Sequence, residues 1–180
     1  MSDPVRILGI SGSLRKGSFN TAALHAAQEL APEGVTFEFA EIGDLPLYND
    51  DDRLQAFPKA VLRLEKQIRA ADAVLFATPE YNYSISGVLK NALDWISRLD
   101  KQPLAGKAAG IIGASGGILG SARAQYHLRQ IGVFLDLRFL NRPEVMIGMA
   151  QDRFDSSGKL TDAKTRELLA KFVVALRDWA

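Results

Sequence analysis

Two kinds of hydrophobic pattern follow one another along the whole chain. Short apolar runs rich in β-branched residues predict five strands, at residues 5–10, 36–41, 73–78, 108–114 and 137–139. Apolar residues three and four positions apart predict helices at residues 20–30, 58–71, 86–98, 121–131 and 161–179. In the helix expected at 58–71, the residues spaced for one buried face are Val61, Leu62, Leu64 and Ile68.

Strands that alternate with helices through short loops indicate right-handed crossovers and a parallel sheet covered on both faces. The rhythm predicts an α/β fold, a flavodoxin-like three-layer sandwich whose five-stranded parallel sheet has the order 2-1-3-4-5. Ligands of such sheets bind beyond the carboxyl ends of the strands, near the switch between the first and third strands. The loops at 11–20, 79–86 and 115–121 should therefore meet there. The 180 residues fit a single domain, 1–180.

The first of these loops has the composition of a phosphate site. Its side chains that can donate hydrogen bonds to phosphate oxygens are Ser11, Ser13, Ser18, Asn20 and Thr21. Arg15 and Lys16 add positive charge, and the following helix directs its free N–H groups to the same place. The alternative interpretation is an ordinary polar loop between a strand and a helix.

Two familiar phosphate motifs do not match this loop. Lys16 precedes Gly17, whereas the P-loop pattern requires glycine, lysine and then serine or threonine. The glycine fingerprint of a dinucleotide-binding Rossmann fold is also missing, and the second strand offers only Glu41 as a ribose partner. The loop therefore predicts phosphate binding of another kind.

The second loop suits a planar ring. Pro79 stiffens the exit from the third strand, and Tyr81 and Tyr83 offer aromatic area. The amide of Asn82 and the backbone N–H groups can bond the polar edges of a heterocycle. Alternatively, the tyrosines pack against neighbouring loops and Asn82 caps a turn.

The third loop is rich in glycine, at Gly116, Gly117 and Gly120. Without side chains, its backbone can approach a ligand closely and direct N–H groups at an electron-rich edge. The alternative is a flexible turn before a helix.

Composition narrows the possible partners. Charged residues make up 24% of the chain and the formal net charge is +1, which does not favour nucleic acid as a partner. The chain has no cysteine, which excludes disulfides, thiolate metal sites, iron–sulfur clusters and thiol redox catalysis. It has neither the pattern of a signal peptide nor an apolar run long enough for a membrane span, so we expect a cytoplasmic protein with no membrane partner.

Other candidate groups favour structural interpretations. Asp50, Asp51 and Asp52 lack further grouped carboxylates, so a solvated loop is expected rather than a cation site. His25 and His127 lie far apart on different predicted helices, which supports neither a metal pair nor a Ser-His-Asp arrangement. We therefore expect no metal site and no acid–base machinery.

Three motifs carry a resemblance to a known family. They read Gly-Ser-Leu-Arg-Lys-Gly-Ser-Phe-Asn at 12–20, Pro-Glu-Tyr-Asn-Tyr-Ser at 79–84 and Leu-Lys-Asn-Ala-Leu-Asp-Trp at 89–95. Together they resemble the NADPH-dependent FMN reductase family over nearly the whole chain. Gln-Tyr-His-Leu-Arg-Gln at 125–130 and Arg-Pro-Glu at 142–144 are similar to the soluble bacterial quinone and chromate reductases of that family.

The resemblance implies an FMN-binding flavodoxin-like fold with NADPH or NADH as co-substrate. The residues it places at the FMN phosphate are Ser11, Ser13, Arg15, Ser18, Phe19 and Asn20. Those it places along the flavin ring are Pro79, Glu80, Tyr81, Asn82 and Tyr83, with Ser115, Gly116 and Gly117 on the other side. Glu80 is expected to act through its backbone, with its side chain turned to a neighbouring arginine. The hydride chemistry belongs to the flavin, so no catalytic side chain is expected.

The activity implied is a two-electron, ping-pong transfer from NAD(P)H to small acceptors such as quinones and chromate. Family members are typically dimers or tetramers, so a homodimer or homotetramer is expected. Arg123, Tyr126 and Glu144 either face a neighbouring subunit or face solvent. Two other functions stay open: a flavodoxin-like electron carrier for protein partners, and an FMN reductase that supplies free reduced flavin to a monooxygenase.

Overall fold

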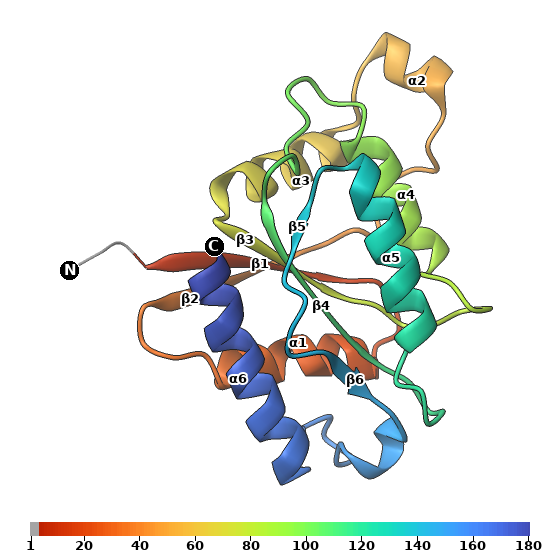
Figure 1. The fold of residues 1–180 in the computed structure, drawn as a ribbon. Helices are drawn as coiled ribbons and strands as arrows, with labels where there is room; N and C mark the ends of the chain where they lie inside the picture. The colour runs from red at the N-terminus through yellow and green to blue at the C-terminus, as the bar shows by residue number, and fades with distance from the viewer. Residues whose placement is uncertain (1–3) are drawn as a thin grey trace.

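The computed structural model describes residues 4–180 and contains a parallel sheet between two layers of helices (Figure 1). The strand order is β2-β1-β3-β4-β5, and β6 also pairs with β4, so the predicted order 2-1-3-4-5 is confirmed. The strands are β1 (Val5–Ser11), β2 (Val35–Ala40), β3 (Ala73–Ala77), β4 (Ala108–Ala114), β5 (Arg138–Phe139) and β6 (Val145–Ile147).

The two faces of the sheet bury different side chains, because successive residues of a strand point to opposite sides. On one face, Ile7 of β1 packs in a cluster with α1 (Phe19–Glu29) and α6 (Ala163–Trp179). On the other, Leu8 packs in a cluster with the helices α3 (Lys59–Ala70), α4 (Gly87–Ile96) and α5 (Ala122–Phe134). Every residue of β3 and β4 is buried, as expected for central strands covered on both faces.

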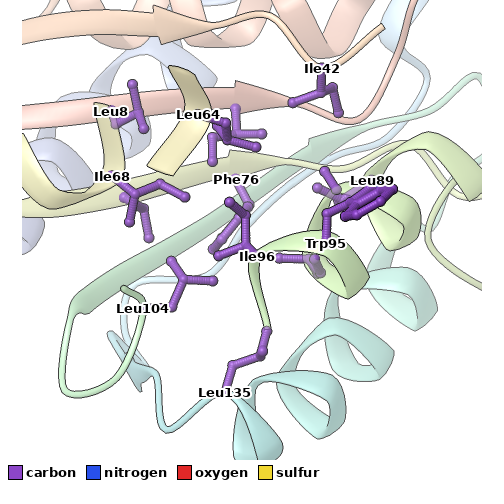
Figure 2. Close-up of a cluster of buried hydrophobic side chains, with 14 of the residues drawn as sticks. Leu8, Ile42, Leu64, Ile68, Phe76, Leu89, Trp95, Ile96, Leu104 and Leu135 are labelled. Atoms are coloured by element: carbon purple, nitrogen blue, oxygen red, sulfur yellow. The ribbon is translucent and has the colours of Figure 1, made fainter. Parts of the chain in front are cut away.

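Figure 2 shows side chains of the second cluster, in which residues of α4 pack with residues of β1, α3 and β3. Trp95 is fully buried, and its indole N–H donates to the carbonyl of Pro46 at 2.8 Å. Asn91, one turn earlier, accepts from the N–H of Tyr48 and donates to the same Pro46 carbonyl. Two residues of the motif at 89–95 therefore hold the loop that follows β2.

Three predictions of local structure are wrong in part. Asp50, Asp51 and Asp52 are solvated but form the first turn of a helix, α2 (Asp50–Gln55), because Asn49 caps it and carboxylates favour the positive end of a helix. In Figure 1, α2 stands away from the sheet. Leu62 is 46% exposed, so the buried stripe of α3 is narrower than predicted.

The third correction concerns the last strand. One strand was expected at 137–139, but two short strands, β5 and β6, pair with successive parts of β4. Pro143 lies between them, and a proline has no N–H to donate to a sheet. The remaining helical turn, η1 (Ala150–Asp152), follows β6. None of the helices within residues 4–180 has the length and hydropathy that crossing a membrane requires.

Candidate functional site

The three predicted loops leave three adjacent parallel strands at the same edge of the sheet. Ser11 at the end of β1 pairs with Ala77 at the end of β3, and Ala77 pairs with Ile112 of β4. The phosphate loop (residues 11–20), the ring loop (residues 79–86) and the glycine loop (residues 115–121) therefore begin side by side, as predicted.

Hydroxyl groups within the phosphate loop set its shape. Ser18 caps α1 by accepting a hydrogen bond from the backbone N–H of Thr21 at 3.2 Å. The hydroxyls of Ser11 and Thr21 lie 2.8 Å apart, and Ser11 also accepts from the N–H of Ser13 at 3.3 Å. The start of α1 is thus fixed at the loop, where its free N–H groups favour an anion.

Arg15 and Lys16 are the exposed cations of the phosphate loop, and Arg15 carries the guanidinium. Its side chain has no hydrogen bond or ion pair with another residue of the described part, 4–180. Ser13, by contrast, is 8% exposed and lies inside the loop. Phe19, at the first position of α1, packs against Phe154 with ring centroids 5.3 Å apart. The donor set, one free guanidinium, hydroxyls and a helix start, fits a phosphate monoester.

Asn20 joins the phosphate loop to β4. Its side-chain N–H donates to the carbonyl of Ala114 at 3.0 Å, and its side-chain oxygen accepts from the N–H of Ala114 at 2.9 Å. Asn20 is only 4% exposed. Both ends of the amide are therefore used by the last residue of β4, and the side chain holds two loops together.

Ser86 joins the phosphate loop to the ring loop. Its hydroxyl donates to the carbonyl of Gly12 at 2.6 Å and accepts from the N–H of Leu89, which caps α4. A Cβ at Gly12 would lie 3.0 Å from Pro79, so glycine permits this close approach. The three loops form one continuous surface beyond the carboxyl ends of β1, β3 and β4.

The ring loop contains a tight turn with an unusual backbone. Tyr81 and Ser84 exchange two backbone hydrogen bonds, at 2.9 and 3.1 Å. The residues between them, Asn82 and Tyr83, have φ of 51° and 69°. Two consecutive positive φ angles define a type I′ turn, which favours glycine in the second position. A tyrosine in the left-handed region costs about 1 kcal/mol or more, so the surroundings must hold the turn.

Glu80 points away from the surface of the ring loop, toward α5. Its carboxylate forms an ion pair with Arg123 and accepts from the backbone N–H groups of Arg123 and Ala124, at 3.1 and 3.3 Å. The guanidinium carbon of Arg123 lies 3.7 Å from the centroid of the Tyr83 ring. The expected turn of the Glu80 side chain to an arginine is confirmed.

The glycine loop is fixed by the segment that follows β6. Ser115 donates its N–H to Ile147 and accepts from the N–H of Ala150, both at 3.0 Å, and Gly117 accepts from Met149. A Cβ at Gly116 would meet only Gln151, at 3.5 Å, so the outer side of the loop is open. Gly120 has a φ of 54° and a Cβ there would overlap the backbone of Met146, so it has a packing role.

Exposed aromatic side chains lie around this surface. Tyr81 is 47% exposed and Tyr83 is 70% exposed. The backbone N–H groups of Asn82, Tyr83, Gly116 and Gly117 form no hydrogen bond with another residue of the part that is described. A flavin, which has a planar ring with polar edges, fits between such donors.

Two cavities border the phosphate loop on other sides. One of 640 Å³ lies between α1 and residues 155–160, and one of 280 Å³ lies between the loop and the end of β2. No ring-loop residue lines either cavity. The larger cavity is therefore not the place where the predicted ring residues gather, and we assign the site to the surface where the three loops meet.

Some contributors to this surface were not among the predicted site residues. Ser86 could have been identified as a helix cap by its place before an apolar run. Arg123 and His127 carry no local signal, because they meet the ring loop only through the packing of α5; the Nδ1 of His127 lies 2.7 Å from the hydroxyl of Ser84. Tyr126 donates to Glu144 of the same chain at 2.9 Å, and this bond raises the pKa of the tyrosine.

Comparison with known proteins agrees with the geometry. Residues 5–152 match the family described as NADPH-dependent FMN reductase. An NAD(P)H-dependent FMN reductase of Pseudomonas aeruginosa is 59% identical, with 99% of this chain and 97% of the relative covered. A quinone reductase of Escherichia coli is 44% identical, with 99% and 97% covered.

A solved structure also has a similar fold. FerB, a flavoenzyme NAD(P)H:(acceptor) oxidoreductase from Paracoccus denitrificans, superposes with a TM-score of 0.88 at 40% identity, covering 97% of this chain and 96% of that one. Sequence and structure agree over nearly the entire length, and the family predicted from the motifs is confirmed. The chain belongs to the NADPH-dependent FMN reductase family of oxidoreductases.

Proposed function

We propose that this protein is an FMN-dependent NAD(P)H:acceptor oxidoreductase that transfers two electrons to quinones and similar acceptors, including chromate, by a ping-pong mechanism. The observation that carries the proposal is that Ser86 joins the anion-binding loop to the aromatic loop at Gly12, while Asn20 joins the anion-binding loop to the end of β4 at Ala114. Relatives named as quinone reductase and as FMN reductase support the choice of substrates.

The phosphate loop would hold the FMN phosphate. Arg15 contributes a guanidinium, Ser13 and Ser18 contribute hydroxyls, and the start of α1 contributes backbone N–H groups. Asn20 uses its side-chain oxygen and one of its two amide N–H groups on Ala114, so it supports the loop from behind and keeps one N–H that could donate to the phosphate.

The ring loop and the glycine loop would hold the flavin ring. Backbone N–H groups at 82, 83, 116 and 117 have no hydrogen-bond partner within residues 4–180 and could bond the polar edges of the ring. Bound FMN supplies the hydride acceptor and electron donor, so the protein's residues bind and orient it. The exposed tyrosines leave this surface accessible, and a single accessible surface must serve the nicotinamide and the electron acceptor in turn.

The test is an anaerobic absorbance measurement on the FMN-loaded protein. NADPH or NADH should bleach the flavin band, and a pulse of benzoquinone or chromate should restore it. Initial rates at several quinone concentrations should give parallel lines in double-reciprocal plots. Intersecting lines would contradict alternate use of one site, and no bleaching with either nicotinamide would contradict the reductase function.

A second function is favoured by the name of the P. aeruginosa relative, in which FMN is the substrate. Reduced FMN would then leave the protein and react elsewhere. Gel filtration distinguishes the two: FMN that stays with the protein at nanomolar concentrations supports the quinone reductase, and FMN that separates supports release.

We also propose that the chain assembles as a homodimer or homotetramer. Val133 and Phe134, at the end of α5, are 81% and 74% exposed. Leu47 is 84% exposed although its neighbours are held on α4. Neighbouring exposed apolar side chains, such as Val133 and Phe134, are more typical of interfaces than single ones. Sedimentation that finds only a 19.7 kDa species would contradict this proposal.

A further inference from the structure

Helix α5 begins without a cap from its own sequence. Ser121, the residue before it, has a φ of 68°, and its side chain makes no capping hydrogen bond. The hydroxyl of Ser121 accepts from the side chain of Gln125 instead, at 3.3 Å. No acidic residue lies in the first turn. The free N–H groups at the start of α5 therefore need a partner from elsewhere in the chain.

Glu80 of the ring loop is that partner. One oxygen of its carboxylate, Oε2, accepts from the N–H groups of Arg123 and Ala124, and the other, Oε1, accepts from the guanidinium of Arg123. The side chain of Glu80 is only 8% exposed, whereas that of Arg123 is 42% exposed. This buried carboxylate holds the ring loop against the start of α5, because the loss of any one of its partners would leave a buried charge that is incompletely paired.

The same arginine supports Tyr83. Its guanidinium lies over the tyrosine ring at 3.7 Å from the centroid, while Tyr83 remains 70% exposed. Tyr83 also has the less favourable of the two left-handed conformations in the turn, since glycine is usual in its position. On its other side, Ser84 bonds His127 of α5. The turn is thus fastened to α5 before, at and after Tyr83.

We propose that Glu80 is a positioning residue for the electron acceptor. Through the start of α5 and the Arg123 guanidinium, it holds the Tyr83 ring as the wall against which a planar acceptor stacks. The proposal rests on the proposed function in taking a quinone as the acceptor. Glu80 itself touches neither the acceptor nor the flavin ring, and its influence passes through Arg123 to Tyr83.

The test is a double-mutant cycle on the binding of benzoquinone. The variants are Glu80→Gln, Tyr83→Ala and both together, each oxidised and saturated with FMN. The dissociation constant of benzoquinone is measured from the change it causes in the flavin absorbance spectrum, without turnover. Asp162→Asn is the matched control, because Asp162 also caps a helix and pairs with an arginine, Arg153.

Glu80→Gln should weaken benzoquinone binding about fivefold, as expected for the loss of one aromatic stacking contact. In the Tyr83→Ala background, the same change should have less than a twofold effect. The KM for benzoquinone should rise by the same factor with kcat within twofold. Asp162→Asn should leave benzoquinone binding within twofold of the wild type.

Arg123→Lys gives a second test in a chain that keeps Glu80. This variant retains a positive charge but loses the planar group over Tyr83, so it should weaken benzoquinone binding about as much as Glu80→Gln does. The proposal would be overturned if Glu80→Gln weakened benzoquinone binding equally in the wild type and in the Tyr83→Ala variant, or if it had no effect on that binding. A wild-type protein that binds FMN and benzoquinone but is not bleached by NAD(P)H would contradict only the proposed function.

Discussion

The phosphate loop and the ring loop lie side by side but are held in different ways. The phosphate loop takes its shape from neighbours in sequence: Ser18 caps the helix that follows it, and Ser11 meets Thr21 ten positions later. The ring loop takes its shape from α5, since Glu80 bonds Arg123, 43 positions away. A loop of the first kind can be identified from its own residues, whereas a loop of the second kind depends on the packing of a distant helix.

Two residues of the phosphate loop also have distant partners: Gly12 is bonded by Ser86, and Asn20 is bonded to Ala114. Removing the Asn20 side chain should have the largest effect on stability. Asn20→Ala leaves the buried N–H and carbonyl of Ala114 without partners, at about 1–3 kcal/mol for each. Urea denaturation should therefore give a free energy of unfolding lower by about 2–6 kcal/mol. FMN affinity should fall with it, because the loop loses its support on β4.

Asn20→Asp is the matched variant for this prediction. Its carboxylate can accept from the N–H of Ala114 but cannot donate to the carbonyl, and its charge would be buried beside that oxygen, so it should lose at least as much stability as Asn20→Ala. Equal stability of wild type and Asn20→Ala would show that the phosphate loop does not depend on its bonds to β4.

The contrast between local and distant support also explains which features could be predicted from the sequence. The order of the sheet follows from alternating hydrophobic periods, and the meeting of three loops follows from that order. The role of Glu80 was only half predictable, because no local pattern shows that Ser121 leaves α5 uncapped. Likewise β6, with three residues beyond Pro143, is too short to carry a periodic signal, and it is recognised only through its pairing with β4.

Arg15 should affect ligand binding without affecting folding. Arg15→Ala would remove the charge-assisted hydrogen bond that we propose to the FMN phosphate, so the affinity for FMN should fall by about 1.5–3 kcal/mol, which is roughly 10- to 150-fold. The urea midpoint should not move, because Arg15 has no partner among residues 4–180. Fluorescence titration of the apoprotein with FMN measures the first quantity.

Lys16→Ala serves as the control for Arg15. Lys16 is equally exposed and carries the same charge, but it lines the cavity beside α1 as well as the loop. A loss of FMN affinity that is as large for Lys16→Ala as for Arg15→Ala would mean that the loop acts by general charge rather than through a directed guanidinium.

His127 provides a smaller test of the ring loop. His127→Ala removes the hydrogen bond to Ser84, an exposed contact for which we expect about 0.5–1 kcal/mol. The free energy of unfolding should fall by no more than this amount, and FMN affinity should fall by less than about fivefold. A larger loss than that caused by Glu80→Gln would place the main support of the loop at Ser84 instead of at Glu80.

The segment that carries α2 offers a reference region, since the side-chain bonds of Asp50 stay within residues 48–53 and reach neither loop. The carboxylate of Asp50 accepts hydrogen bonds from Arg53 at 2.7 Å and from Tyr48 at 2.6 Å. These bonds, of which the one from Arg53 has the larger effect, lower the pKa of Asp50 from 3.8 to about 2. A lowered pKa stabilises the folded state above pH 4, and that contribution is lost as the pH falls from about 4 to about 2. The difference in urea midpoint between wild type and Asp50→Asn should therefore shrink over this interval, while FMN affinity at neutral pH stays the same. A difference that does not change with pH would mean that the carboxylate's charge does not stabilise the segment, and a change in FMN affinity would mean that the segment is coupled to the loops and cannot serve as their reference.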